Sequence, residues 1–408
     1  MPSPVVVTGI GIISSIGNNA GDTINSLLSG KSGISPISVL NTRYRDDYVL
    51  GEVKLSQAEL AEMANVDSSA PWTRTALLGL IAAREAVKDA NIIDDKTART
   101  GLISASTVGG MDRSELYYKD FLGEAKHNKF IDTHPAGDHT EKIAKELDIN
   151  DYLATISTAC SSSLNSIMFG ARLIDNGILD RVLVGGTDAL SKFTLNGFNT
   201  LMILDKEHCR PFDQSRNGLN LGEGAAYLVL ESENLATQRK KSIHAYLSGY
   251  ANANDAHHQT ASSGDGTGPY LAMKKALEKA NLKPGDIDYI NVHGTGTENN
   301  DLTEGIALKR LFKDQIPAFS STKAFTGHTL GAAGAIESVF SVLALKNQVL
   351  LPNLNFKNSI EEIDIEPVTE IKKADLKHVL SNSFGFGGND SSVIFSAANV
   401  NIDKGSKN

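Results

Sequence analysis

The sequence predicts an α/β protein with a buried, largely parallel sheet. Short runs rich in β-branched residues alternate along the chain with longer segments whose apolar residues recur at three- and four-residue spacing. The 36 glycines fall mostly at the ends of these segments, where tight turns need them. With 408 residues, of which 41% are hydrophobic and 21% are charged, the chain can bury a sizeable core.

The expected elements follow in chain order. Short β-branched runs predict strands at 5–8, 181–184, 226–231, 289–292, 379–382 and 393–395. Amphipathic spacing predicts helices at 77–90, 270–280, 303–311 and 334–345. The polar segment 126–141 is expected to be a loop, and 401–408 a frayed tail. A rise in charge density near 231–241 indicates a division of the chain into two halves.

Composition argues against several classes of protein. The chain has 39 Lys and Arg against 48 Asp and Glu, so its net charge of −9 disfavours a nucleic-acid-binding protein. Two cysteines are too few for a disulfide scaffold, which favours a reducing compartment. The first residues resemble a strand rather than a signal peptide, and no apolar run reaches membrane-spanning length. We therefore expect a cytoplasmic protein that does not enter a membrane.

Metal and cofactor signals are weak. Gly9 and Gly11 follow the first strand, but Ser14 stands where the dinucleotide fingerprint has its third glycine. The histidines lack the spacings typical of metal ligands. We therefore expect neither a metal nor a cofactor.

Cys160 lies where a strand-like run ends and a helical apolar stripe begins. The free N–H groups and the positive end of the helix dipole would favour a thiolate there and could hold an adjacent oxyanion. The local sequence leaves two interpretations open, a nucleophile or a buried structural cysteine. Cys209 lies in a loop two residues before a proline and is expected to be a packing residue.

Three further residues of catalytic type follow strand-like runs in the second half. His293 ends a buried strand pattern, at the edge of a parallel sheet where ligands bind. Lys323 and His328 lie five residues apart in a glycine-rich segment, and Glu337 on the following helix could pair with Lys323. The competing interpretations are a histidine that caps a strand and a solvated lysine, although the apolar neighbours of Lys323 favour a buried, paired one.

The segment 381–390 has the pattern of a strand that leads into a loop with three glycines. Phe384 or Phe386 could act as a gate on this loop, and an ordinary glycine turn is the alternative.

At these residues the chain resembles the β-ketoacyl-acyl carrier protein synthases, which are condensing enzymes, and more narrowly the elongating type with one cysteine and two histidines. The resemblance rests on four motifs in the right order, at 158–162, 293–297, 323–328 and 385–388. It implies the thiolase-like αβαβα layered sandwich of two duplicated halves. We place the first half, with the nucleophilic cysteine, at 1–235 and the second half, with the His, Lys and His residues, at 236–408.

The resemblance also implies a decarboxylative Claisen condensation. Cys160 would accept an acyl chain from acyl carrier protein, with the backbone N–H groups of Cys160 and Phe386 as the oxyanion hole. His293 and His328, as neutral imidazoles, would donate hydrogen bonds to the thioester oxygen of malonyl-carrier protein. Lys323 would orient the site, with Glu337 in support.

Substrate contacts follow from the same resemblance. Residues expected to bind the pantetheine arm or the acyl chain, or to form the oxyanion and gate loop, are Thr295, Thr297, Val108, Phe384, Gly385 and Gly387. Acyl and malonyl carrier proteins are the expected partners, and the protein is expected to be a homodimer, with a heterodimer as the alternative. Because carrier proteins are acidic, the net charge of −9 calls for a basic patch at the channel mouth, for which Arg210 is a candidate.

Two departures from the family pattern bear on specificity. Residues 112–152 follow the pattern poorly, and Gly388-Asn389-Asp390 stands where Gly-Thr-Asn is expected. Both departures are compatible with a specialised synthase, such as one that makes aryl polyenes or other secondary acyl chains. A non-decarboxylating thiolase and a non-catalytic chain-length partner subunit are the competing hypotheses, and the presence of all four catalytic-type residues disfavours the subunit.

Overall fold

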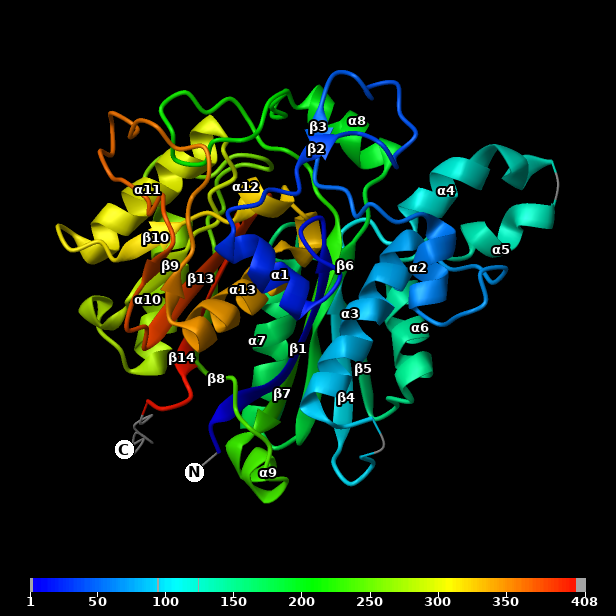
Figure 1. The fold of residues 1–408 in the computed structure, drawn as a ribbon, viewed down its shortest axis with the longest axis horizontal. Helices are drawn as coiled ribbons and strands as arrows, with labels where there is room; N and C mark the ends of the chain where they lie inside the picture. The colour runs from blue at the N-terminus through cyan, green and yellow to red at the C-terminus, as the bar shows by residue number, and fades with distance from the viewer. Residues whose placement is uncertain (1–2, 94, 124, 401–408) are drawn as a thin grey trace.

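The computed structural model describes residues 3–93, 95–123 and 125–400, and it places ten strands in one continuous mixed sheet. Figure 1 shows this sheet as two sets of strands side by side. The first set contains β1 (Val5–Ser14), β4 (Thr100–Ala105), β5 (Tyr152–Ile156), β6 (Arg181–Asp188) and β7 (Gly224–Ser232). The second contains β8 (Ala245–Asn254), β9 (Tyr289–Asn291), β10 (Ala318–Ser320), β13 (His378–Gly385) and β14 (Asn389–Ala397).

The two sets repeat one topology. Their strand orders are β1-β7-β6-β4-β5 and β8-β14-β13-β9-β10, so the strands occupy equivalent places when each set is counted along the chain. In both sets the first two neighbouring pairs are antiparallel and the last two are parallel. The sets join where β1 runs antiparallel to β8. This repeated pattern is the duplication that the family resemblance implied.

The expectation of a largely parallel sheet is wrong. Strands β13 and β14 are joined by the short loop at 386–388, and such a connection pairs strands antiparallel. The equivalent β6 and β7 are antiparallel as well. Parallel pairing is confined to β4, β5 and β6 and to β9, β10 and β13.

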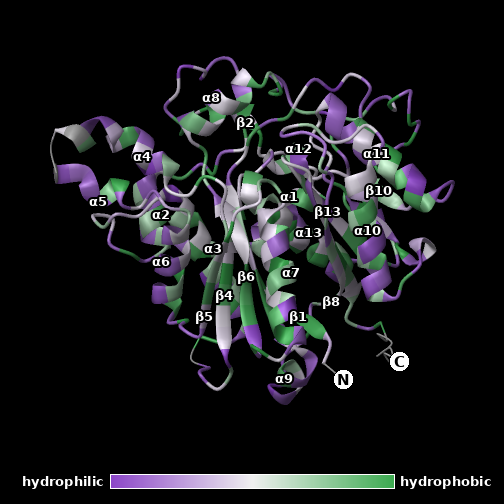
Figure 2. Ribbon diagram, turned by 180° about the vertical axis from the view of Figure 1, so that it is seen from behind, coloured by the Kyte–Doolittle hydropathy of each residue, from purple (hydrophilic) through white to green (hydrophobic). Residues whose placement is uncertain are grey.

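Helices complete the five layers. Helices α7 (Ser162–Asp175) and α13 (Ala333–Asn347) share one apolar core with strands of both sets, which places them in the middle layer. Helices α3 (Arg74–Ala90) and α6 (Gly137–Leu147) pack on the outer face of the first set, and α10 (Thr267–Ala280) and α11 (Glu298–Phe312) on that of the second. In Figure 2 the strands and α3 are mainly green or white, whereas purple residues gather in peripheral helices such as α6 and α9 (Glu233–Gln238).

The remaining strands and α-helices have nine residues or fewer. They are α1 (Ala20–Leu28), β2 (Ser35–Pro36), β3 (Val49–Leu50), α2 (Gln57–Met63), α4 (Met111–Tyr117), α5 (Asn128–Ile131), α8 (Lys192–Thr200), α12 (Lys323–Thr326), β11 (Val349–Leu350) and β12 (Lys372–Lys373). None of the helices in the described part of the chain is long and apolar enough to span a membrane.

The expected strands and helices are all present and mostly longer than the sequence pattern indicated. The loop expected at 126–141 is wrong, because this segment contains α5 and the start of α6. The buried face of α6 includes His139 and Thr140 beside Ile143, and these polar residues conceal its amphipathic pattern. The expected frayed tail at 401–408 lies outside the described residues.

Glycines in β1 let a helix approach the sheet closely. A Cβ on Gly9 would collide with the carbonyl oxygen of Ala86, and one on Gly11 with that of Ala82, both on α3. These two glycines therefore serve strand-to-helix packing, which explains their spacing without a dinucleotide site.

Candidate active site

A strained turn between β5 and α7 presents Cys160. The strand ends at Ile156, so the expectation that it runs to the cysteine is wrong by four residues. Ala159 adopts φ +53°, a left-handed conformation that non-glycine residues seldom occupy. The Ser383 hydroxyl donates to the Cys160 carbonyl at 2.9 Å, which ties this turn to β13. The turn therefore fixes the cysteine directly before the middle-layer helix.

Burial dominates the protonation of Cys160. The side chain is buried, which raises the pKa of the thiol to about 11, although Lys323 and the backbone N–H groups of Phe386 and Cys160 act in the opposite direction. The backbone N–H groups favour the thiolate, as expected, but desolvation outweighs them, so the thiol rests protonated at neutral pH. Both backbone N–H groups nevertheless point at the sulfur, where they can receive an oxyanion.

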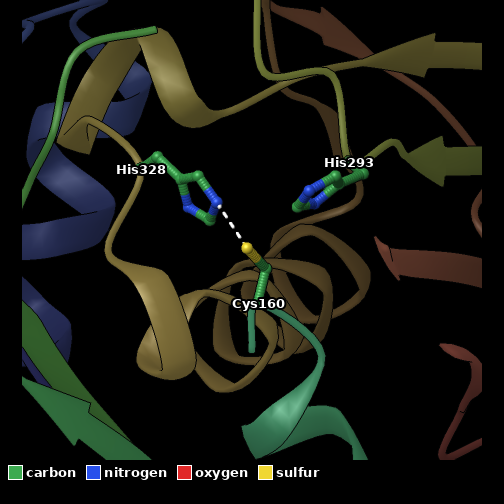
Figure 3. Close-up of side chains that lie close together, drawn as sticks. All are labelled: Cys160, His293 and His328. Carbon is green, nitrogen blue, oxygen red and sulfur yellow. Dashed lines mark hydrogen bonds between the residues drawn. The ribbon is translucent and has the colours of Figure 1, made fainter. Parts of the chain in front are cut away.

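His328 contacts the sulfur directly. Its Nε2 lies 3.0 Å from Sγ of Cys160, as the dashed line in Figure 3 marks. On the other side of the ring, the backbone N–H of Leu330 donates to Nδ1 at 3.3 Å. Because Nδ1 accepts a hydrogen bond, the ring proton belongs on Nε2. His328 therefore directs an N–H donor at the reactive sulfur.

Lys323 fixes the second histidine in the same tautomer. The His293 ring lies 5.4 Å from the His328 ring between centroids, at 84°. The ammonium of Lys323 makes three contacts, with the His293 carbonyl at 2.6 Å, His293 Nδ1 at 3.1 Å and Glu337 Oε1 at 2.5 Å. Donation to Nδ1 leaves the His293 proton on Nε2. Figure 3 shows the His293 ring beside Cys160 and His328.

Both histidines are neutral. Burial and the nearby Lys323 charge hold the pKa of His293 and that of His328 well below the ordinary value. Burial raises the pKa of Glu337 to about 7, against the opposing effect of Lys323. The buried cation therefore supports two uncharged N–H donors.

The glycine loop between β13 and β14 closes the site. Gly387 and Gly388 have φ of +82° and +75°, so this turn requires glycine at both positions. The Phe386 ring stacks on Phe198 from α8, with centroids 6.0 Å apart and an angle of 18°. Phe384 lies edge-on to His293 at 5.8 Å.

Two cavities meet at Cys160. One, of about 360 Å³, is lined by both histidines and by residues expected to bind the substrate: Thr295, Thr297, Phe384, Gly385 and Gly387. The other, of about 370 Å³, is almost wholly apolar and includes Val108, Phe193, Leu201 and Leu330. Cys160, Phe198 and Phe386 line both, so the stacked phenylalanines stand between the two cavities.

Two expected residues lie away from the reacting groups. Arg210 forms ion pairs with Asp205 at 3.3 Å and Glu207 at 3.4 Å, so its charge is compensated within the chain. Cys209 is buried, and burial raises the pKa of its thiol to about 12. Its backbone N–H donates to Asn220, consistent with a packing role.

Three residues of the site carry little or no signal in the sequence. Phe198 has no local signal beyond its place on an amphipathic helix. Glu304 accepts the backbone N–H groups of His293 and Gly294 at 2.9 and 2.8 Å and so shapes the histidine turn. Asn389 Oδ1 accepts from Ser161 at 2.7 Å. Only the departure from the expected Gly-Thr-Asn pattern pointed to Asn389.

The cysteine and the two histidines form the one trio with the spacing of metal ligands in residues 3–93, 95–123 and 125–400. Their donor atoms lie within 4.8 Å of one another. The proton on His328 Nε2, fixed by Leu330, points at Cys160 and leaves no lone pair there for a metal. The donor set therefore fits acyl chemistry better than metal binding.

The duplicated five-layer fold and a cysteine flanked by two imidazole N–H donors define a thiolase-fold condensing enzyme. Residues 2–236 match the family model "Beta-ketoacyl synthase, N-terminal domain", and residues 244–357 match "Beta-ketoacyl synthase, C-terminal domain". The chain belongs to the β-ketoacyl synthase family, whose members are acyl-transferring condensing enzymes.

Relatives are similar to this chain over nearly its whole length. It is 34% identical over 405 residues to 3-oxoacyl-[acyl-carrier-protein] synthase 2 of Staphylococcus aureus, covering 96% of this chain and 97% of that protein. It is 33% identical to the protein of the same name from Coxiella burnetii, covering 96% and 98%.

Among solved structures, the ishigamide ketosynthase/chain length factor superposes with a TM-score of 0.91 at 31% identity, covering 97% of this chain and 100% of that one. The ketosynthase ApeO from Xenorhabdus doucetiae, in complex with its chain length factor ApeC, gives a TM-score of 0.85 at 30% identity, covering 97% and 98%.

Proposed function

We propose that this protein extends an acyl chain held on Cys160 by condensing it with malonyl-carrier protein, with loss of CO₂. The observation that carries this proposal is the convergence of five groups where two cavities meet. These are the Cys160 sulfur, the two imidazole N–H groups of His293 and His328, and the backbone N–H groups of Cys160 and Phe386.

Acylation loads the cysteine. Cys160 Sγ attacks the thioester of acyl-carrier protein, and the backbone N–H groups of Cys160 and Phe386 hold the oxyanion. The thiol proton leaves with the sulfur of the departing carrier. Because the resting thiol has a raised pKa, this step depends on the donors around the sulfur rather than on a preformed thiolate.

Condensation uses the two neutral histidines. Their Nε2–H groups donate to the thioester oxygen of malonyl-carrier protein and stabilise the enolate that forms when CO₂ leaves. The enolate carbon attacks the acyl-Cys160 carbonyl, and the sulfur departs and regains a proton. Imidazoles with strongly lowered pKa values remain N–H donors across neutral pH, as this step requires.

The two cavities would hold different parts of the substrate. We assign the pantetheine arm to the cavity with Thr295 and Thr297 and the acyl chain to the apolar cavity with Val108. The stacked Phe198 and Phe386 rings then form the gate between them.

Acyl carrier protein is the proposed partner. Two observations support it: the name of the relatives, 3-oxoacyl-[acyl-carrier-protein] synthase, and a ketosynthase solved with its carrier protein at a TM-score of 0.86 and 28% identity. We propose that the protein is a homodimer, because β5 is an edge strand of the sheet and its Leu153 is 42% exposed. We also propose that it is cytoplasmic. A heterodimer with a chain length factor is the alternative, as in two of the structural relatives. Within each copy we divide the halves at 1–235 and 236–408.

A specialised acyl chain is the second candidate substrate. The ishigamide ketosynthase/chain length factor and ApeO are both similar to this chain over nearly its whole length. Because both are named with a chain length factor, this similarity favours a specialised acyl chain as an alternative to fatty acid synthesis. A thiolase is disfavoured because two N–H donors, rather than a second thiol, face Cys160.

A two-stage assay tests the proposal. Purified protein is offered a panel of saturated, unsaturated and aromatic acyl-carrier proteins, and the Cys160 adduct is followed by intact-protein mass spectrometry. Malonyl-carrier protein is added second, and the 3-oxoacyl product and CO₂ are measured. We expect an adduct with at least one donor and product only with malonyl-carrier protein. Condensation that persists in Cys160→Ala would refute the mechanism.

A further inference from the structure

Asp390 is a buried acid directly behind the glycine loop. It is the second residue of β14, two residues after Gly388. Its side chain is 1% exposed, and its Oδ2 has no hydrogen-bond partner among the described residues. That oxygen lies against the first turn of α10, where a Cβ on Gly268 would collide with it. An ionised carboxylate in this place would be buried without a donor for one of its oxygens.

Two other carboxylates face Asp390, and both accept hydrogen bonds from neighbouring groups. Asp255, before α10, accepts from the Ser263 hydroxyl at 2.6 Å and from the Gly268 N–H at 3.2 Å. Glu304, on α11, accepts the backbone N–H groups of the histidine turn and the Asn382 side-chain amide at 3.0 Å. For Glu304 these donors favour the ionised form, but burial outweighs them and raises its pKa to about 7, so Glu304 is ionised before Asp390 as the pH rises.

The strands on either side of Asp390 bring no charge. Its neighbour across β8 is Ala253 and its neighbour across β13 is Phe384. No Lys, Arg or His forms an ion pair with Asp390 within the part of the chain that the structure describes. Burial and the charges of Asp255 and Glu304 together raise the pKa of Asp390 to about 8.

Asp255 connects this acid to the catalytic loop. The Asp255 N–H donates to the Gly388 carbonyl at 2.8 Å, and the Gly387 N–H donates to the Gln259 carbonyl at 2.8 Å. The segment that begins at Asp255 therefore supports the loop that presents the Phe386 N–H to Cys160. Repulsion between Asp390 and Asp255 would act directly on that support.

We propose that Asp390 is a positioning residue that works in its protonated form. As a neutral acid it lets Asp255 and Glu304 lie behind the glycine loop, and the Phe386 N–H then stays directed at Cys160. When Asp390 loses its proton to alkaline solvent, three carboxylates repel one another and the loop is displaced. The catalytic consequence rests on the proposed condensation.

The first test is a pH profile of condensation for the wild type, Asp390→Asn and Asp255→Asn, each normalised to its own rate at pH 7. Asparagine has the shape of the neutral acid and cannot ionise. We expect the wild-type rate to fall with a midpoint near pH 8, by about tenfold per pH unit beyond it. Asp390→Asn should lose this fall. Asp255→Asn should move the midpoint of the fall to lower pH, because the negative charge of Asp255, which raises the pKa of Asp390, is removed.

The direction for Asp255→Asn follows from the sign of the repulsion. A neighbouring negative charge raises the pKa of a carboxyl group, so removing that charge lowers the pKa of Asp390 itself. The loop, however, is displaced by the repulsion between Asp390 and Asp255, and Asp255→Asn removes that repulsion as well. The fall in rate should therefore begin at lower pH in Asp255→Asn than in the wild type, and it should be shallower.

The second test needs no substrate. Between about pH 4 and pH 8 the folded protein holds a proton on Asp390 that the unfolded chain has released, so its stability falls as pH rises through this window. The difference in unfolding temperature between Asp390→Asn and the wild type should therefore grow up to about pH 8 and stay constant above it.

These readouts separate the possible failures. A wild-type midpoint retained in Asp390→Asn, or a melting difference that does not change with pH, would overturn the role of Asp390. A melting difference with the expected pH dependence, in a protein that forms no condensation product at any pH, would instead overturn the proposed function. If Asp390→Asn does not fold, the Asp255→Asn profile decides: a fall as steep as that of the wild type is evidence against the inference.

Discussion

Replacing Lys323 with methionine should separate the two half-reactions of this enzyme. Methionine fills a similar volume but supplies no N–H donor. Without the ammonium, His293 Nδ1 loses the donor 3.1 Å away that keeps the ring proton on Nε2. The tautomer with the proton on Nδ1 then becomes accessible, and in it Nε2 cannot donate to the substrate oxygen. Losing one such donor lowers a rate by about 10²–10³.

The same change removes the partner of Glu337. The Lys323 and Glu337 side chains are 1% and 3% exposed, so this is a fully buried ion pair. Breaking a buried pair on one side destabilises a protein by about 3–5 kcal/mol. Here the cost is limited, because Glu337, whose pKa is already about 7, can take up a proton. We therefore expect a folded protein whose stability loss lies at or below the lower end of that range.

Decarboxylation of malonyl-carrier protein should fall by about 10²–10³ in Lys323→Met, whereas acylation of Cys160 falls less. CO₂ release and intact mass measure the two steps separately. The matched control is Glu337→Gln, which leaves the lysine to donate to His293 and should keep decarboxylation within about tenfold of the wild type. The reasoning is refuted if Glu337→Gln is as damaging as Lys323→Met, or if acylation and decarboxylation fall equally.

Three further predictions concern the nucleophile, the gate and the scaffold. Cys160→Ser should abolish detectable condensation, because a hydroxyl is a far weaker nucleophile, and mass spectrometry should find no acyl adduct. Phe198→Ala should remove the ring stacked on Phe386, join the two cavities and broaden the range of accepted acyl lengths in a competition assay; an unchanged product distribution contradicts the gate. Arg74→Met should destabilise the protein by about 3–5 kcal/mol in urea unfolding, because it leaves the buried Glu223 carboxylate without its ion-pair partner. Adding Glu223→Leu to the same chain should restore much of the lost stability.

The layered fold could be predicted from the sequence, because the family motifs implied it and the strand order confirms it. The direction in which neighbouring strands pair could not be predicted. A β-branched run such as 379–382 indicates a buried strand but not the direction of its neighbour, which the short loop to β14 sets. Helix α6 was missed for a related reason, because whether His139 faces water or a core depends on the residues packed against it.

Several site properties also needed the three-dimensional arrangement. The sequence placed Cys160 near a helix terminus and suggested a thiolate, but it could not weigh that effect against burial, which raises the thiol pKa. It identified Phe386 without its stacking partner Phe198, which is 188 residues away along the chain. Arg210 was a candidate for the basic patch, and its ion pairs with the nearby Asp205 and Glu207 became evident only in the folded chain.

The sequence by itself determined the chemical groups of this protein. A cysteine before an apolar helix, histidines at 293 and 328, a lysine and a glycine-rich loop are local patterns, because each is written in a short segment. Tertiary structure alone decided how those groups behave: which nitrogen of each histidine carries the proton, that the thiol rests protonated, and that Asp390 lies between two other carboxylates. Protonation and tautomer depend on burial and on partners from distant parts of the chain, and only the folded protein brings these together.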